Sequence, residues 1–89
     1  MLLNQSTKKL EVELYGGLRK FSDLKVLEVE VPVAAVAADV RRALIHRLGG
    51  EGCRDLIETC ALAQGDEIMG ETDLIDRSRV AFLPPVCGG

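Results

Sequence analysis

The hydrophobic period of the chain changes at Pro32, and this change limits the folds that the chain can adopt. Lys9–Tyr15 and Val26–Val31 alternate between apolar and polar side chains, which predicts two strands that each bury one face. After Pro32, apolar residues recur at helical spacing as far as Gly49-Gly50, which predicts one amphipathic helix. No capping side chain marks its start, which we place near Ala34–Val36.

Shorter elements are predicted in the second half of the chain. Cys53–Glu58 is typical of a short helical turn, and Cys60–Gln64 and Glu67–Met69 of two short strands around a turn. Arg79–Leu83 is expected to be the last strand. Apolar anchors are expected in the loops, at Leu18 and Phe21 and at Leu74 and Ile75. This order predicts an α+β fold in which a mixed sheet of four to five strands packs on one main helix.

Length and composition indicate one small domain, residues 1–89. Apolar residues make up 47% of the chain and charged residues 28%, which excludes a disordered chain. The net charge of −3 argues against a nucleic-acid partner, and the longest apolar run, Val33–Ala38, is too short to span a membrane. With three cysteines and no signal peptide, we expect free thiols and a cytoplasmic location.

An ordinary active site is not evident in the sequence. The one histidine, His46, has no nucleophile pattern beside it and is interpreted as a helix-surface residue. The three cysteines lack metal-site spacing, so no bound metal is expected; they are Cys53, Cys60 and Cys87. We interpret Cys60 as a small apolar strand residue, and the glutamates of the first two strands as a solvated sheet face; these are Glu11, Glu13, Glu28 and Glu30.

The C-terminal segment 84–89 is the unusual part of the chain. Pro84 and Pro85 favour an extended backbone, so the segment is expected to project from the last strand as a semi-rigid arm. Gly88 and Gly89 have no side chains and fit a channel that admits only backbone. The α-carboxylate of Gly89 and the thiol of Cys87 are the reactive groups of this arm.

The string Val-Ala-Phe-Leu-Pro-Pro-Val-Cys-Gly-Gly at residues 80–89, with Asp73-Leu74 before it, resembles the ubiquitin-like sulfur carriers of the MoaD/ThiS family. The resemblance extends from Lys9 to Gly89 and is strongest to small subunits of molybdopterin synthase. It implies a β-grasp, or ubiquitin-like, fold.

The resemblance also implies a chemical cycle at Gly89. An adenylating (E1-like) enzyme would activate its carboxylate with ATP, and a sulfurtransferase or cysteine desulfurase would supply sulfur and leave a thiocarboxylate. An acceptor enzyme, such as the large subunit of molybdopterin synthase, would then receive the sulfur. In this cycle the chain is a non-catalytic subunit, binds no cofactor of its own and contacts neither nucleic acid nor membrane.

The residues expected to bind these partners lie on the tail and at its base. They are Phe82, Leu83, Pro84, Pro85, Val86 and Cys87, together with Leu62, for which a core position is an equal alternative. The chain departs from the family pattern at Cys87, where a serine, threonine or alanine is usual, and at Arg77-Ser78-Arg79, where an acidic pair is usual. Gln64-Gly65 also replaces the usual Asn-Gly, and the proline of Asp-x-Pro-Leu is absent.

Other functions remain open at the level of sequence. The sulfur could serve thiamine thiazole, cysteine or another thio-metabolite instead of molybdopterin. A ubiquitin-like modifier, joined through Gly89 to a lysine of a target protein, begins with the same adenylation. A binding module with an inert tail is the third alternative.

Overall fold

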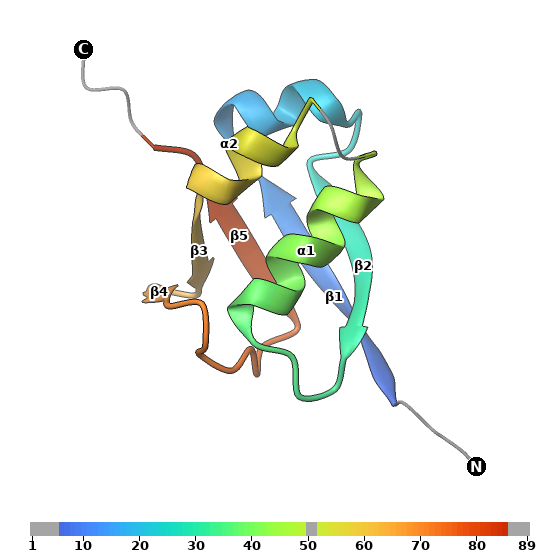
Figure 1. Ribbon diagram of the computed structural model, residues 1–89, viewed down its shortest axis with the longest axis vertical. Coiled ribbons are helices and arrows are strands. Elements are labelled where there is room, and N and C mark those ends of the chain that lie inside the picture. Colours follow the sequence, from blue (N-terminus) through green and yellow to red (C-terminus); the bar gives the residue numbers. More distant parts are fainter. Residues whose placement is uncertain (1–5, 50–51, 86–89) are drawn as a thin grey trace.

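The computed structural model describes residues 6–49 and 52–85 and contains a single mixed sheet with helices on one side (Figure 1). The strands are β1 (Thr7–Leu14), β2 (Val26–Pro32), β3 (Ala61–Gln64), β4 (Glu67–Met69) and β5 (Arg79–Leu83). The helices are the 3₁₀ helix η1 (Gly16–Phe21), α1 (Ala37–Arg47) and α2 (Arg54–Thr59).

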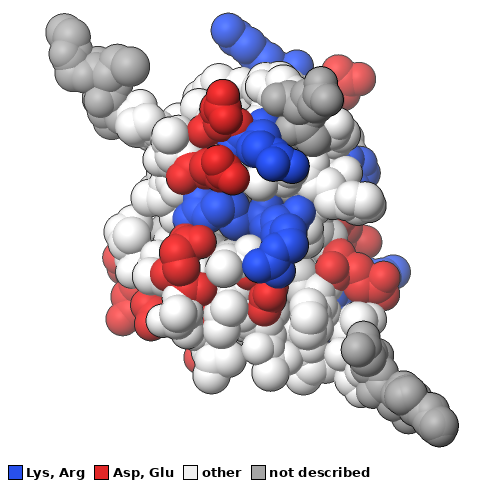
Figure 2. All heavy atoms as spheres, in the orientation of Figure 1, with Lys and Arg blue, Asp and Glu red and all other residues white. Residues whose placement is uncertain are grey.

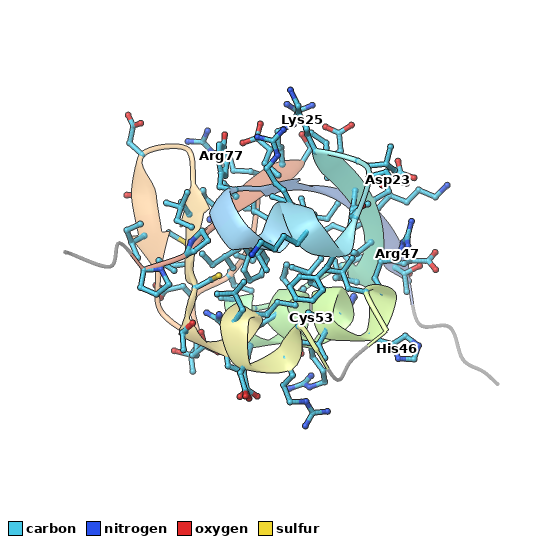
Figure 3. The ribbon with its side chains drawn as sticks, turned by 90° about the horizontal axis from the view of Figure 1, so that it is seen from above. Asp23, Lys25, His46, Arg47, Cys53 and Arg77 are labelled. Carbon is cyan, nitrogen blue, oxygen red and sulfur yellow. The ribbon has the colours of Figure 1, made fainter. Side chains whose placement is uncertain are left out.

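The sheet has five strands in the order β2-β1-β5-β3-β4. β1 pairs antiparallel with β2 and parallel with β5, and β3 pairs antiparallel with both β5 and β4. α1 and α2 cover one face of this sheet, and the opposite face carries no helix in the part of the chain that the structure describes (Figures 1 and 3). The predicted α+β architecture and its β-grasp arrangement are confirmed.

The core lies between the helices and the inward-facing side chains of the strands. Alternation places Leu10, Val12 and Leu14 of β1 inside, as the sequence pattern predicts. The other large, fully buried side chains are Leu18, Leu27, Val31, Val40, Leu44, Ile57, Leu62, Ile75, Val80 and Phe82. Every buried side-chain nitrogen or oxygen of the described residues has a hydrogen-bond partner, which is typical of a well-packed domain.

The N-terminus of α1 is capped by a distant loop. The backbone amides of Ala37 and Ala38 donate to the carbonyls of Asp73 and Glu71, each at 3.0 Å. The Asp39 carboxylate accepts from the Val36 amide at 3.0 Å. These bonds satisfy donors that a local capping side chain would otherwise serve. The helix therefore begins at Ala37 although no capping signal precedes it.

Two of the expected loop anchors are exposed. Leu74 is 62% exposed, because the Val36–Leu74 bridge holds its backbone while Ile75 next to it fills the core. The ring of Phe21 is also largely at the surface and lies against Gly52. Leu18 and Ile75 are buried as predicted, so each loop is anchored by one apolar residue instead of two.

The helical face carries both basic and acidic side chains. Figure 2 shows basic side chains gathered near the centre of this face, with acidic side chains around them. Arg41 pairs with Glu71 and Arg42 with Asp39 on this face, whereas Arg79 pairs with both Glu11 and Glu13 on the open face of the sheet. Among the described residues, no helix has the length and apolar character needed to cross a membrane.

Candidate functional site

The candidate site lies where β5 ends and the chain leaves the sheet through Pro84 and Pro85. Leu83, the last strand residue, pairs with Ala61 of β3, and the residue before it in β5 pairs with Leu14 of β1. The base of the tail is therefore held on both sides, by β3 and by the end of β1. α2 and η1 lie at the same end of the sheet (Figure 1).

Gly16 supports the base of the tail directly. Its φ of +58° is a conformation that side-chain-bearing residues rarely adopt. A Cβ atom at this position would also lie 3.1 Å from Cγ of Pro84. Gly17 beside it is close to Leu56 of α2, whose Cδ2 would be 3.3 Å from an added Cβ. The two glycines thus let the turn after β1 fit between the tail and α2.

The substitution Gly16→Ala tests this contact. We expect a loss of about 1–2 kcal/mol in the free energy of unfolding, from the left-handed backbone, together with a displacement of Pro84. The displacement is measured by changes in the backbone amide resonances of Ala61 and Leu83. Gly49→Ala is the matched control, because Gly49 also has a positive φ, +91°, but no atom within 4 Å of an added Cβ. Equal resonance changes in both variants would refute the contact.

The predicted partner-binding residues divide into buried and accessible groups. The side chains of Leu62 and Phe82 are fully buried, so they belong to the core and support the surface from beneath. For Leu62 the structure selects the core alternative, because its strand position faces the helices. Leu83 and Pro84 are half-buried and Pro85 is exposed. The remaining predicted site residues lie outside the described residues; they are Val86, Cys87, Gly88 and Gly89.

An apolar area on the open face of the sheet borders the tail base. The register places Ala63 of β3 opposite both Ile68 of β4 and Ala81 of β5, and Ala61 opposite Leu83. We call these five residues, Ala61, Ala63, Ile68, Ala81 and Leu83, the sheet patch. Ile68 is its most accessible member, at 61% exposure. Sequence reasoning missed Ile68, although pairing across the Gly65-Asp66 turn would have placed it opposite Ala63.

A hollow of about 320 Å³ adjoins the sheet patch, and its charged lining residues are Arg77, Arg79 and Glu13. Arg79 lies between the carboxylates of Glu11 and Glu13, with contacts of 2.7 and 3.1 Å. Hydrogen bonds to these carboxylates raise the pKa of Arg79, and a hydrogen bond from Tyr15 to Glu13 raises the pKa of the Tyr15 phenol. The predicted carboxylate face therefore holds a structural ion-pair network along β1 and β5.

Arg77 has no ion pair with any described residue. Figure 3 shows it on the side of the sheet opposite α1 and α2. Its Nη1 would be 3.2 Å from a Cβ atom at Gly65, so the absence of a side chain there leaves room for the guanidinium. The hollow beside the sheet patch thus has an uncompensated positive charge at its edge, which suits an anionic group on a partner.

Gln64 fixes the loop that leads into β5. Its side-chain carbonyl accepts from the amides of Asp76 and Arg77 at 2.9 and 3.0 Å, and its amide group donates to the carbonyl of Leu74 at 3.3 Å. The side chain is buried, so these bonds replace the water it would otherwise bind. The unusual Gln64-Gly65 pair therefore serves the loop through Gln64 and the hairpin turn through Gly65, whose φ is +59°.

Arg41 ties the two helices to β5. Its Nη1 atom donates to the carbonyls of Ile57 and Cys60 at 2.6 and 2.8 Å, at the end of α2. Its Nη2 atom pairs with Glu71 at 2.7 Å, and the guanidinium carbon lies 5.6 Å from the ring centre of Phe82. Arg41 thereby closes the C-terminal end of α2 and fixes the entry into β3, next to the tail base.

The described cysteines and the histidine form no chemical site. Cys53 and Cys60 are buried, and burial raises the pKa of the Cys60 thiol, which donates to the Leu56 carbonyl at 3.1 Å. A neutral buried thiol is a poor nucleophile and fits the predicted packing role. His46 is exposed near the end of α1, as predicted (Figure 3). No group of three potential ligands for a metal occurs among the described residues.

Solved structures with the same fold were found. SAMP1 from Haloferax volcanii has a TM-score of 0.73 and 19% identity, covering 92% of this chain and 100% of that chain. The Haloferax volcanii HVO 2177 protein has a TM-score of 0.72 and 23% identity, covering 100% of this chain and 93% of that chain. A chain of the complex of subunits 1 and 2 of molybdopterin-converting factor from Helicobacter pylori 26695 has a TM-score of 0.58 and 26% identity, with coverages of 92% and 100%.

No protein-family model and no curated protein matches the sequence. The structural neighbours include both a small archaeal modifier protein and a molybdopterin-converting factor chain. At the level of the fold they confirm the resemblance to the MoaD/ThiS-like, ubiquitin-like carriers.

Proposed function

We propose that this chain is a sulfur carrier that holds sulfur as a thiocarboxylate at Gly89 and delivers it to a biosynthetic acceptor enzyme. The observation that carries the proposal is the tail base: Pro84 lies on Gly16, next to the Leu83 end of an apolar sheet patch that reaches the hollow beside Arg77 at the start of β5. A docking surface next to a projecting tail lets a partner bind the domain while the tail enters its active site. Molybdopterin synthesis is the proposed pathway, since a molybdopterin-converting factor chain is among the structural neighbours.

The proposed chemistry takes place outside the domain. A carboxylate is a poor acylating agent, so one Gly89 oxygen first attacks the α-phosphorus of ATP and pyrophosphate leaves. The terminal sulfur of a persulfide on a sulfurtransferase or cysteine desulfurase then attacks the acyl carbon, and AMP leaves. A second thiol reduces the resulting acyl disulfide, which releases the thiocarboxylate and forms a disulfide on the donor. The domain contributes binding and placement, and ATP is consumed by the activating enzyme.

The described surface indicates how a partner would bind. Half-buried Leu83 and exposed Ile68 provide the accessible apolar area of the sheet patch. Arg77 adds a positive charge at its edge, where the family usually has acidic residues. We therefore propose a partner surface with an apolar centre and a carboxylate that faces Arg77. This charge pairing distinguishes the partners of this chain from those of carriers with an acidic segment before the last strand.

Intact mass spectrometry tests the proposal. The untagged chain is incubated with ATP, a candidate activating enzyme and a persulfide donor, and its mass is compared with that of the untreated chain. We expect the replacement of one oxygen by sulfur, located in the peptide that contains Gly88-Gly89. The matched control carries one additional alanine after Gly89 and should keep its mass. Equal sulfur incorporation in both chains, or none with any activating enzyme of this class, would refute the assignment to Gly89.

A ubiquitin-like modifier is the second candidate function. Two structures of the Haloferax volcanii modifier protein have TM-scores of 0.73 and 0.71, above the 0.58 of the molybdopterin-converting factor chain. In this function a lysine amine of a target protein attacks the activated Gly89 carbonyl and AMP leaves, which forms an isopeptide bond. Conjugates that retain this chain after reduction and denaturation, with the tryptic remnant Val80–Gly89 on a target lysine, would support the modifier over the carrier.

A further inference from the structure

The edge strand β2 and helix α1 enclose a groove away from the tail base. β2 is the first strand in the sheet order, so only one of its sides is paired. The groove has a volume of about 520 Å³ and is lined by Glu28–Pro32 of β2 and, from α1, by Asp39, Arg42, Ala43, His46 and Arg47. In Figure 1, β2 lies on the opposite side of the molecule from the end of β5.

The backbone of β2 has outward hydrogen-bonding groups along this groove that have no partner among residues 6–49 and 52–85. Leu14 donates to the carbonyl of Lys25, and Val33 donates to that of Ser6, which identifies these pairs as hydrogen-bonded. Because such pairs alternate along an antiparallel ladder, the register directs the N–H and C=O groups of Val29 and Val31 toward β1. The same groups of Glu28 and Glu30 point away from β1. Two successive outward residues form a template for an additional strand.

The side chains along the groove show which chemistry it accepts. Val29 and Val31 are buried on the helix side of β2, and Ala43 opposite them is small, so the floor is apolar. Arg47 and His46 stand at one end of the groove, near the end of α1 (Figure 3), and Arg47 has no ion pair with a described residue. On the open face of the sheet, Glu28 and Glu30 are exposed side by side on the same strand.

These charges argue against a second copy of this chain as the occupant. An antiparallel pairing of β2 with β2 of another copy, centred on Val29, would bring Glu28 opposite Glu30 of that copy and Glu30 opposite its Glu28. Like charges directly opposite one another destabilise a strand pair. A segment with lysine or arginine at these positions would gain from the same carboxylates.

We propose that the groove between β2 and α1 binds an extended segment of a partner protein, which adds to the five-stranded sheet beside β2. Alternate side chains of this segment are basic and face Glu28 and Glu30. The side chains between them are apolar and enter the groove over Val31 and Ala43, with one carboxylate near Arg47. Main-chain hydrogen bonds provide much of the affinity, and the alternating side chains provide the specificity. This site is separate from the tail base, so a partner can bind here while Gly89 reacts elsewhere.

A short synthetic peptide provides the probe. Lysine and valine alternate in it, and one groove-facing valine is replaced by aspartate. Titration of the full-length protein, followed through its backbone amide resonances, should show changes at Glu28, Glu30 and Ala43, with a Kd of about 0.1–1 mM. A peptide with glutamate in place of lysine should bind at least about tenfold more weakly.

Two variants separate the backbone contact from the charge. Glu28→Pro removes an outward N–H that β1 does not use, and edge strands tolerate proline at such positions. Glu28→Ala removes the same carboxylate but retains the N–H. We expect Glu28→Pro to bind the peptide about tenfold more weakly than Glu28→Ala. If Glu28→Pro does not fold, a peptide N-methylated on the groups that face β2 tests the same hydrogen bonds in the wild-type protein and should bind at least tenfold more weakly.

Several results would overturn the proposal. These are equal affinities of the two variants, equal affinities of the N-methylated and unmethylated peptides, and resonance changes confined to the sheet patch. A concentration-dependent dimer that is lost in Glu28→Pro would identify a second copy of the chain as the occupant instead.

Discussion

Replacement of Arg41 by methionine is expected to lower the free energy of unfolding by about 3 kcal/mol, a large share of the roughly 5–10 kcal/mol available to a domain of this size. The Arg41 side chain is only 12% exposed and donates to two carbonyls, at Ile57 and Cys60. Methionine keeps the length of the aliphatic part of the side chain, but it lacks the guanidinium over Phe82 and leaves both carbonyls without this donor. Hydrogen bonds from charged donors contribute about 1.5–3 kcal/mol each and are not additive.

The neighbouring Arg42→Met is the matched control. The Arg42 side chain is 74% exposed and pairs only with Asp39, three residues earlier on the same helix. Such exposed pairs contribute about 0.5 kcal/mol or less. Urea unfolding followed by circular dichroism measures both variants. A difference of less than about 1 kcal/mol between them would show that Arg41 does not hold α2 to the sheet.

Replacement of Leu83 by aspartate is expected to weaken binding of the activating enzyme by about 30-fold, or about 2 kcal/mol. Leu83 is the member of the sheet patch closest to the tail, and a carboxylate there must lose its water when the apolar centre of a partner covers it. In steady-state kinetics of adenylation, the KM for the carrier should rise while kcat changes little. The activating enzyme used in these kinetics is the one that gives sulfur incorporation at Gly89 in the mass spectrometry experiment.

Leu24→Asp provides the control for this effect. Leu24 is also an exposed leucine, but it lies just before β2, which β1 separates from β5 in the sheet. The same change of side chain there should leave the KM within about twofold, since surface substitutions away from an interface have small effects. Similar KM values for the two variants would exclude the sheet patch as the docking surface.

The proposed function and the groove beside β2 can be tested separately. Gly89 chemistry requires the tail and the sheet patch, whereas peptide binding at β2 requires Glu28 and the groove wall of α1. If the chain carries sulfur but does not bind the lysine-valine peptide, the sulfur-carrier proposal is supported and the groove proposal is refuted. The reverse result would leave a binding module with an inert tail, which is the third alternative from the sequence.

The candidate site could be predicted from the sequence only in part. The tail could be predicted from the residue types alone, because Pro84-Pro85 restrict the backbone to extended conformations and Gly88-Gly89 leave it without side chains. The supporting residues gave no such signal. In the sequence, Gly16 is the residue after the predicted strand Lys9–Tyr15, and Ile68 is one apolar residue in the short strand Glu67–Met69. Their places at the tail base and in the sheet patch follow from β1 beside β5 and β4 beside β3.

The sequence by itself determined the strands, the main helix and the α+β class, because alternation and helical spacing are local properties that each segment carries within itself. Tertiary structure decided what depends on contacts between distant segments. It assigned Leu62 and Phe82 to the core, capped α1 with the carbonyls of Glu71 and Asp73, and placed Pro84 on Gly16. The physical reason is that burial, capping and close approach each depend on contacts between two segments that are distant in the sequence. The local pattern of one segment does not show which other segment it will contact.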